Sequence, residues 1–361
     1  MRIALVHDYL NQYGGAERVL EAFSEIFPEA PIYTLFYDKE KTLGRFEDRI
    51  RGTSFLNRNA VIKNHRNFIP LMPIAAASLN LKNDYDVVLS SSAGYGKGVR
   101  MDPGTFHISY CHTPLRYAWE YKKYFDWNPI VKMAAAPMFW YLRNWDKAAG
   151  QKPNLIIANS KHIAEKIKRY YGRNSEVLYP PVDLKLFYRD PKIEKEGYFL
   201  AVGRMMKYKR FDLIIQAFNK LNLPLLIVGD GPELENLKQL AKSARISFLP
   251  FAGEDQLRIL YNGAEALIFP QVEDFGLVAA EAQTCGLPVI AFGEGGVREI
   301  VEDGVTGIFF YSQSVEDLIM AVKKFLLSSF NEEVIRKSAK RFSKASFKKK
   351  ILNIVARANL V

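Results

Sequence analysis

The chain has 361 residues, of which 48% are hydrophobic and 25% charged, a composition typical of a globular protein and unlike that of a disordered or fibrous chain. This length is sufficient for two domains with separate cores. Its two cysteines, Cys111 and Cys285, form no CxxC motif, which argues against a zinc site and favours a reducing compartment. No apolar run reaches the roughly 18 residues that span a bilayer, and the N-terminal run is too short for a signal peptide. We therefore predict a cytoplasmic protein.

The net charge of +11 is unevenly distributed along the chain. Residues 1–183 carry 25 Lys and Arg against 18 Asp and Glu, residues 184–330 carry 16 against 19, and residues 331–361 carry 9 against 2. A basic excess in the first half and in the tail can meet nucleic acid, anionic lipid or an acidic substrate. A solvated basic surface is the alternative.

The first half of the sequence predicts a doubly wound α/β domain. It opens with an apolar run at residues 3–6, a loop with Gly14 and Gly15, and a helical pattern over residues 16–27. Short apolar runs that end in polar or glycine residues predict further buried parallel strands at 87–89, 107–110 and 155–158.

A second α/β pattern begins after Pro180 and Pro181, which stiffen a predicted domain boundary. A helix is predicted over residues 212–221 and further helices over 332–358. Strands are predicted at 198–202, 225–228, 246–249, 266–269 and 288–291. We therefore predict an N-terminal domain of residues 1–182 and a C-terminal domain of residues 183–340.

Two motifs in the first half are candidates for ligand contact. Gly14 and Gly15 open the first predicted helix, where glycines let the backbone approach a phosphate and the helix N-terminus favours an anion. The pair is not the G-x-G-x-x-G fingerprint, which disfavours a nicotinamide dinucleotide. His112 follows the strand at 107–110 and can hydrogen-bond a sugar hydroxyl, with a purely structural histidine as the alternative.

Two further motifs follow strands of the second half. Gly203, Arg204 and Lys209 form a loop whose two cations can neutralise a departing diphosphate as a metal ion would. A solvated surface loop is the alternative. The sequence Gly229-Asp-Gly231 favours a plain strand-to-helix turn over direct ligand contact.

Two carboxylates, Glu273 and Glu281, lie on either side of a change from strand to helix. The apolar run that ends at Pro270 predicts a strand, and a helical pattern begins after Gly276. The first N–H groups of such a helix can bind an anion. An anion that carries hydroxyl groups, such as a nucleotide sugar, would fit beside Glu273. The later glycine loop, with Gly295 and Gly296, can shape the same pocket or simply turn.

Taken in order, these motifs resemble glycosyltransferase family four, whose members are retaining transferases of the GT-B fold. The resemblance covers nearly the whole chain and is strongest over residues 198–310. His-Asp-Tyr at 7–9, Gly-Gly-Ala-Glu-Arg at 14–18 and Cys-His-Thr-Pro at 111–114 resemble its mannosyltransferase branch. It implies an α/β protein with two Rossmann-like, doubly wound domains that face a cleft. The C-terminal helix, within residues 341–361, would return to the N-terminal domain.

The resemblance also implies a role for each matching residue. Arg204 and Lys209 would bind the donor diphosphate without a metal ion, while Glu273 would contact the donor sugar and Glu281 the ribose. His112 would bind the sugar and act in catalysis. The remaining donor contacts would come from backbone groups and from the nucleobase pocket: Gly14, Gly15, Gly203, Leu249, Phe251, Phe275, Gly276 and Leu277. One departure is Arg210, which stands where the family often has glycine and leaves the local turn in doubt.

The implied function is that of a metal-independent hexosyltransferase with no cofactor. The first candidate is transfer of mannose from GDP-mannose to a lipid-linked, polysaccharide or glycolipid acceptor. A UDP-sugar-dependent glycosyltransferase and a GT-B-type sugar-nucleotide epimerase are the alternatives. A basic nucleic-acid-binding protein is disfavoured, because no helix concentrates positive charge together with base-reading residues.

A peripheral contact with the inner face of the cell membrane is a further expectation. The basic residues Arg58, Lys63 and Arg66 precede an apolar run at 68–74. Four tryptophans lie among aromatic and basic residues further on: Trp119, Trp127, Trp140 and Trp145. Such segments can lie on an anionic membrane surface, with a lining of the domain core as the alternative.

Overall fold

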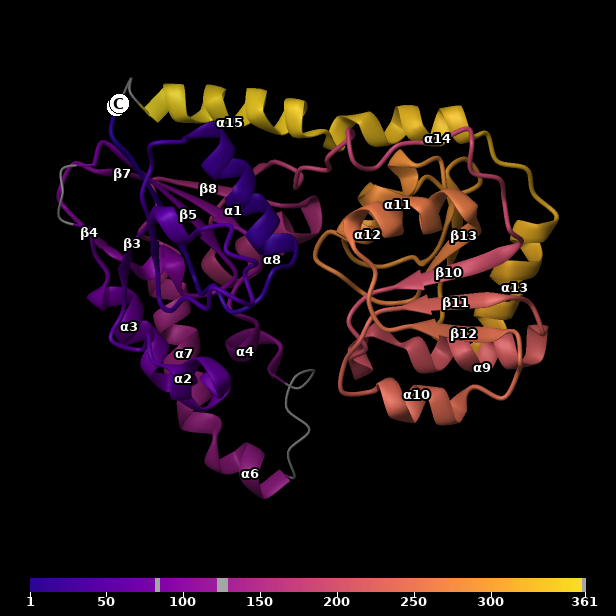
Figure 1. The fold of residues 1–361 in the computed structure, drawn as a ribbon. Coiled ribbons are helices and arrows are strands. Elements are labelled where there is room, and N and C mark those ends of the chain that lie inside the picture. The colour runs from indigo at the N-terminus through magenta and orange to yellow at the C-terminus, as the bar shows by residue number, and fades with distance from the viewer. Residues whose placement is uncertain (82–84, 122–128, 359–361) are drawn as a thin grey trace. The chain divides into compact units, whose positions relative to one another are not determined.

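The computed structural model describes residues 1–81, 85–121 and 129–358 (Figure 1). The chain forms two compact units, one of Met1–Pro181 with Phe347–Val361 and the other of Val182–Ser346. Each unit contains an open parallel sheet with helices, the doubly wound α/β architecture that the sequence predicts.

The first unit is built on a parallel sheet with the strand order β3-β2-β1-β5-β7-β8-β9. The strands are β1 (Ile3–His7), β2 (Ile32–Thr34), β3 (Ile50–Thr53), β5 (Val87–Ser92), β7 (Phe106–Cys111), β8 (Leu155–Ala158) and β9 (Glu176–Val177). A separate parallel pair is formed by β4 (Asn80–Leu81) and β6 (Arg100–Met101). The four central strands β1, β5, β7 and β8 occupy the apolar runs that predicted them.

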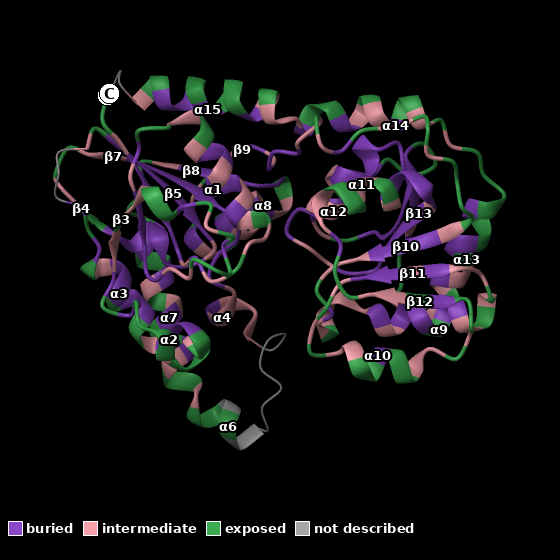
Figure 2. Ribbon diagram, viewed as in Figure 1, coloured by how far each residue is buried: buried purple, intermediate pink, exposed green. Residues whose placement is uncertain are grey.

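Helices cover both faces of this sheet, whose buried strands appear purple in Figure 2. Leu5 and Leu89 face a core shared with α1 (Gly15–Ile26) and α15 (Lys344–Ala358). Val6 and Val88 face the opposite core, which includes residues of α3 (Met72–Ser78) and α7 (Ala136–Ala149). This alternation is the two-residue period of a strand buried on both faces. The other helices are α2 (Asn59–Lys63), α4 (Arg116–Trp119), α6 (Pro129–Ala134) and α8 (Lys161–Tyr171).

The second unit contains a parallel sheet with the strand order β12-β11-β10-β13-β14-β15. The strands are β10 (Tyr198–Val202), β11 (Leu225–Val228), β12 (Ile246–Leu249), β13 (Ala264–Phe269), β14 (Val289–Phe292) and β15 (Gly307–Phe310). Its helices are α9 (Phe211–Leu221), α10 (Leu234–Leu240), α11 (Glu254–Gly263), α12 (Leu277–Thr284), α13 (Val315–Leu326) and α14 (Glu332–Ala339). All five predicted strands are present, and β15 is an additional edge strand.

The C-terminal segment joins the first unit later than expected. Residues 341–346 were expected to belong with the N-terminal domain, but they pack in the second unit. The backbone N–H of Val182 donates to the carbonyl of Phe342 over 2.7 Å, and Lys344 forms an ion pair with Asp183 at 3.1 Å. From Phe347 onwards the chain packs on the first unit, where the Phe347 ring stacks on Phe23 with centroids 5.5 Å apart.

The tryptophan-rich segment is divided between core and surface. Trp119 stacks on Tyr170 with ring centroids 4.3 Å apart, and Trp145 packs against Tyr95 at 5.6 Å. Trp140 is 69% exposed, whereas Trp127 lies outside the described residues. Two of these tryptophans therefore serve the core, which was the alternative to a membrane role. None of the helices in the described ranges is long and apolar enough to cross a membrane.

A buried ion pair ties four elements of the first unit together. Lys97 Nζ lies 2.6 Å from Asp146 Oδ1, and both side chains are almost fully buried. The other carboxylate oxygen of Asp146 accepts hydrogen bonds from Trp119 Nε1 at 2.7 Å and from the Tyr171 hydroxyl at 2.8 Å. Asp146 thus links α7 to the short helix at Gly96–Gly98, to α4 and to α8.

We expect Lys97→Met to lower the free energy of unfolding by about 3–5 kcal/mol, because it leaves a buried carboxylate without its cation. Urea unfolding of the full chain, followed by tryptophan fluorescence, measures the change. The matched control is Lys220→Met, which breaks the exposed Lys220–Glu316 pair at 3.1 Å and should cost less than about 1 kcal/mol. Equal losses in the two variants would contradict this account of Asp146.

Candidate functional site

The predicted site residues of the second unit gather where its strand order reverses. The chain enters the sheet at β10, adds β11 and β12 on one side, and then crosses to β13 on the other side of β10. Loops that leave neighbouring strands at such a reversal turn to opposite faces, so a crevice opens at the carboxyl ends of the strands. The loop with Arg204 and Lys209 follows β10, and the loop with Glu273 follows β13.

The structure brings Lys209 and Glu273 into direct contact. The Lys209 ammonium pairs with Glu273 Oε1, although 64 residues separate the two in sequence. Gln271 Nε2 donates to the same carboxylate oxygen over 3.3 Å. Both members of the pair are partly buried, with 14% of the lysine and 20% of the glutamate side chain exposed. Arg204 is exposed beside Gly203, and a Cβ atom on Gly203 would lie 3.9 Å from the Lys209 ammonium nitrogen.

Close backbone approach fixes the Glu273 loop. A Cβ atom on Gly296 would lie 2.4 Å from the carbonyl oxygen of Asp274 and 2.4 Å from Phe275 Cα. The Gly296 N–H donates to the Glu273 carbonyl over 2.8 Å. The glycine pair at 295–296 therefore supports the loop that carries Glu273. A role in shaping a sugar or base pocket stays a prediction.

The Gly229-Asp-Gly231 turn supports the basic loop in the same way. A Cβ atom on Gly229 would lie 2.1 Å from the Gly203 carbonyl oxygen, and one on Gly231 would lie 2.4 Å from that of Met205. Two backbone hydrogen bonds join the loops, from Gly203 N–H to Val228 O at 3.0 Å and from Met205 N–H to Asp230 O at 2.8 Å. The glycines thus allow main chain to pack on main chain.

Arg210, where the resemblance led us to expect glycine, adopts a backbone conformation that favours glycine. Its φ of 57° lies in the left-handed region, which costs a non-glycine residue about 1–2 kcal/mol. Its guanidinium donates to Gln313 Oε1 at 3.2 Å and to Asp212 Oδ1 at 3.3 Å. Gln313 in turn donates to the Pro270 carbonyl at 2.7 Å. Arg210 therefore links the basic loop to the exit of β13, a contact that the sequence did not predict.

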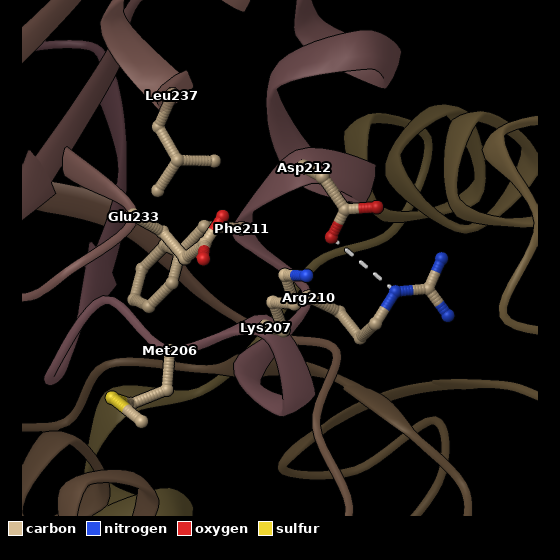
Figure 3. A pocket seen from close by; sticks show the side chains of 7 residues that line it. All are labelled: Met206, Lys207, Arg210, Phe211, Asp212, Glu233 and Leu237. Atoms are coloured by element: carbon tan, nitrogen blue, oxygen red, sulfur yellow. Dashed lines mark hydrogen bonds and ion pairs between the residues drawn. The ribbon is translucent and has the colours of Figure 1, made fainter. Parts of the chain in front are cut away.

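A pocket of about 220 Å³ lies beside this loop, toward α10 (Figure 3). Arg210 and Asp212 border it together with apolar side chains, and Figure 3 shows their hydrogen bond. Its lining consists of Met206, Lys207, Arg210, Phe211, Asp212, Glu233 and Leu237. None of the predicted donor contacts belongs to this lining, so the pocket is separate from the Lys209–Glu273 pair.

The start of α12 has the backbone expected of an anion site. Gly276 is its N-cap residue with a φ of 103°, and the first N–H groups, beginning at Leu277, have no acceptor within the helix. The Phe275 ring is buried and packs edge-on against Phe342, with centroids 5.4 Å apart. Phe275 thereby anchors the turn between Glu273 and the helix.

Glu281 lies on the first turns of α12 and is buried, with 2% exposed. Its carboxylate accepts a hydrogen bond from the Tyr261 hydroxyl over 3.2 Å. Burial, followed by the charge of Glu281, raises the pKa of the nearby Cys285 thiol to about 12, so this thiol stays protonated at neutral pH. The assignment of Glu281 to the ribose stays a prediction.

The residues expected at the nucleobase lie at the end of β12. The Leu249 carbonyl accepts the Gly229 N–H over 2.9 Å, so this backbone belongs to the same set of joined loops. Phe251 is 79% exposed, unusual for so large an apolar ring. An exposed aromatic face at a strand end suits stacking on a base, and the assignment stays a prediction.

In the first unit the strand order reverses between β1 and β5, and the predicted glycines Gly14 and Gly15 follow β1 at this point. Gly14 precedes α1 and donates its N–H to Glu17 Oε2 over 2.9 Å, while Gly15 is the first residue of the helix. A Cβ atom on Gly15 would meet nothing within 4 Å, so the space in front of the helix is open. His112 follows β7 and is 8% exposed.

Asp8 is a structural residue that the sequence reasoning missed. Its buried carboxylate accepts from the Ser92 hydroxyl at 3.0 Å and from the backbone N–H groups of Ala93 at 2.6 Å, Tyr95 at 3.0 Å and Gly96. It therefore holds the turn after β5 against the end of β1. The only available signal was its place in His-Asp-Tyr at 7–9, directly after a strand.

No group of three His, Cys, Asp or Glu side chains suited to a metal ion occurs within 1–81, 85–121 and 129–358. The cation that the structure places against Glu273 is the Lys209 ammonium, and Arg204 lies on the same loop. Metal independence stays a prediction.

The two parallel sheets define a protein of the GT-B class, and solved structures agree. The chain aligns over 99% of its length with Anabaena HepE in complex with UDP, covering 100% of that chain at 18% identity with a TM-score of 0.74. It aligns with sucrose-phosphate synthase from Thermosynechococcus elongatus over 99% of both chains, at 17% identity and a TM-score of 0.70.

Family models match almost the entire chain. Residues 13–186 match the model for Glycosyltransferase Family 4, and residues 185–349 match that for glycosyl transferases group 1. The chain belongs to glycosyltransferase family 4. Among curated relatives, D-inositol 3-phosphate glycosyltransferase of Mycobacterium leprae is 32% identical over 171 residues, which cover 42% of this chain. The match spans only 40% of that relative's length.

We expect Gly296→Ala to destabilise the second unit by about 1–3 kcal/mol, because the new methyl group overlaps the backbone of residues 274 and 275. Thermal unfolding measures the loss, and hydrogen exchange at 273–277 reports whether the loop moves. Gly253→Ala is the control, since Gly253 also precedes a helix but has no atom within 4 Å of the added carbon. Unchanged stability and exchange in Gly296→Ala would contradict the close-approach argument.

Proposed function

We propose that the protein is a retaining glycosyltransferase that moves a hexosyl group from a nucleotide sugar to a lipid-linked or glycan acceptor. The observation that carries this proposal is the contact between Lys209 and Glu273 beside the N-terminus of α12. A cation, a carboxylate and open N–H groups lie together at a strand reversal. This set matches a donor with a negative diphosphate and a hydroxyl-rich sugar.

The proposed chemistry follows from where charge develops. As the bond between the sugar C1 and the phosphate oxygen breaks, the leaving diphosphate gains negative charge. Lys209, Arg204 and the α12 N-terminus would stabilise that charge without a metal ion. The acceptor oxygen would bond to C1 on the same face, and its proton would pass to the departing phosphate oxygen. Glu273 would hold sugar hydroxyls, and His112 would contact the sugar.

Mannose from GDP-mannose is our first candidate donor, on the residues that resemble the mannosyltransferase branch. A UDP sugar is a second candidate, because the similar HepE structure holds UDP. A thermal-shift panel of GDP, UDP and ADP sugars separates them by which nucleotide raises the unfolding temperature. Incubation of the bound sugar nucleotide without acceptor tests the epimerase alternative, which alone yields an altered sugar nucleotide.

We expect Lys209→Ala to lower kcat/KM for transfer by about 10²–10³-fold, because it removes one stabilising group for the leaving diphosphate. Glu273→Gln should lose activity too, since an amide cannot carry the charge that pairs with Lys209. Labelled sugar transfer to an acceptor extract measures both rates. The control Lys238→Ala removes an exposed lysine paired with Glu235 at 2.9 Å and should keep full activity. Unchanged turnover in folded Lys209→Ala would end the proposal, and loss of turnover in EDTA would refute metal independence.

We further propose that the first unit binds an anionic membrane surface at the inner face of the cell membrane. The exposed residues from the start of α2 to α3 combine positive charge with apolar side chains: Arg58, Lys63, Arg66, Leu71 and Ile74. Leu71 is 41% and Ile74 56% exposed, while Met72 and Ala75 of the same run serve the core. Charge attraction and shallow apolar insertion are the two terms of interfacial binding.

Flotation with vesicles that contain anionic lipid should recover the protein at low salt and much less of it at high salt. The double variant Lys63→Glu with Arg66→Glu should weaken recovery at low salt by reversing the local charge. Lys220→Glu makes a similar charge change in the second unit and should have little effect. Absence of low-salt binding by the unmodified protein would rule out the membrane proposal.

A further inference from the structure

Four buried polar side chains form a continuous chain across the carboxyl ends of three neighbouring strands in the first unit. Glu17 Oε1 lies 3.6 Å from His7 Nε2, and His7 Nδ1 lies 3.2 Å from Ser91 Oγ. Ser91 Oγ lies 2.8 Å from His112 Nε2. Each of the four side chains is at least nine-tenths buried. The register explains the assembly, because His7 on β1 lies directly beside Ser91 on β5.

The Ser91 hydroxyl, between the two imidazoles, determines which groups in this chain donate and which accept. Ser91 has one proton, so it donates to one imidazole and accepts from the other. The Glu17 carboxylate favours a proton on the His7 nitrogen that faces it, Nε2, which leaves His7 Nδ1 as an acceptor. Ser91 then donates to His7, and its oxygen accepts the hydrogen of His112 Nε2.

We propose that Glu17, His7 and Ser91 are positioning residues that hold His112 as the Nε2–H tautomer. The remaining nitrogen of the ring, Nδ1, is then an acceptor, so a sugar hydroxyl would donate to His112 and would not receive a hydrogen bond from it. The consequence for sugar recognition rests on the function proposed above. The tautomer itself is a property of the first unit alone.

The backbone of His112 is fixed independently of this chain. Its N–H donates to the Ser92 carbonyl over 2.8 Å, and its carbonyl accepts from Asn159 Nδ2 over 3.0 Å. The Tyr110 ring packs edge-on against the imidazole with centroids 5.1 Å apart. Loss of the Ser91 hydroxyl should therefore alter the tautomer while leaving the ring in place.

Strands β5 and β7 also contain a matched pair of residues that can serve as a control. Ser90 Oγ lies 2.9 Å from His107 Nε2, and both side chains are fully buried. Ser90 and Ser91 are consecutive strand residues and point to opposite faces of the sheet. Burial lowers the pKa of His107 to about 3, so this histidine is neutral. Ser90→Ala removes a buried serine–histidine hydrogen bond without touching His112.

The experiment is nitrogen-15 NMR of the full chain with labelled histidine, in which protonated and bare ring nitrogens are resolved. We expect His112 to be protonated at Nε2 in the unmodified protein and to become a tautomer mixture in Ser91→Ala. Ser90→Ala should leave the His112 signals unchanged. Glu17→Gln keeps the Gly14 contact through its amide oxygen and places its NH2 group opposite His7 Nε2. It should therefore reverse the order of donors and acceptors and shift His112 toward the Nδ1–H tautomer.

Transfer kinetics supply a second readout. Ser91→Ala should lower kcat by about tenfold, the effect of one hydrogen bond, with a smaller change in the KM for the donor. Ser91→Cys keeps a weak donor and acceptor of similar size and should restore part of the loss. Ser90→Ala should keep kcat.

The results separate this inference from the proposed function. His112 protonated at Nδ1 in the unmodified protein, or unchanged by Ser91→Ala, would overturn the inference whether or not the protein transfers sugar. The expected tautomer in a protein that turns over no nucleotide sugar would support the inference and refute the function. Equal losses of kcat in Ser91→Ala and Ser90→Ala would show only structural roles and overturn it.

Discussion

The reversal of strand order in each sheet is the constraint on which the candidate site residues of each unit depend. A parallel sheet places all of its carboxyl ends on one edge, and only at a reversal do adjacent loops turn apart and leave polar groups unobstructed. In the second unit the reversal falls between β10 and β13, so Lys209 and Glu273 meet there although no local sequence signal joins them. In the first unit it falls between β1 and β5, where His7 contacts Ser91 and Asp8 contacts Ser92. The strand order of each sheet therefore determines which side chains of these loops come into contact.

Close backbone packing fixes the loops that carry Lys209 and Glu273 in the second unit. Gly229 and Gly296 each place their α-carbons where a side chain would overlap a neighbouring main chain. The loops are consequently held by main-chain hydrogen bonds, which cost little side-chain entropy. Arg210 differs from these glycines, because its backbone is in the unfavourable left-handed region and its side chain stabilises the loop by a hydrogen bond to Gln313.

Local sequence patterns predicted the elements but not the contacts between them. Apolar runs identified β1, β5, β7, β8 and all central strands of the second unit, because buried parallel strands are continuously apolar. The short strands β2 and β9 were missed, since two or three residues are too few for a periodic signal. The site residues were chosen by resemblance and by their place after strands. Their partners could not be predicted: Gln313 bonds Arg210 from 103 residues away, and Ser91 lies 84 residues from His7. Such pairs are set by strand order and register, which a single sequence does not reveal.

The polar groups of the two units differ in burial and in the kind of interaction they make. This contrast supports a division of roles within the proposed transferase. Lys209 and Glu273 form a partly exposed ion pair, so each can leave the other for a charged ligand at modest desolvation cost. The chain of contacts that ends at His112 is buried, and Ser91 lies between its two imidazoles. The position of the single Ser91 proton determines which imidazole accepts a hydrogen bond and which donates one. A neutral sugar hydroxyl is recognised by hydrogen bonds of defined direction. A departing diphosphate is instead stabilised by positive charge. The charged loop therefore suits the leaving group, and the buried histidine suits the neutral sugar.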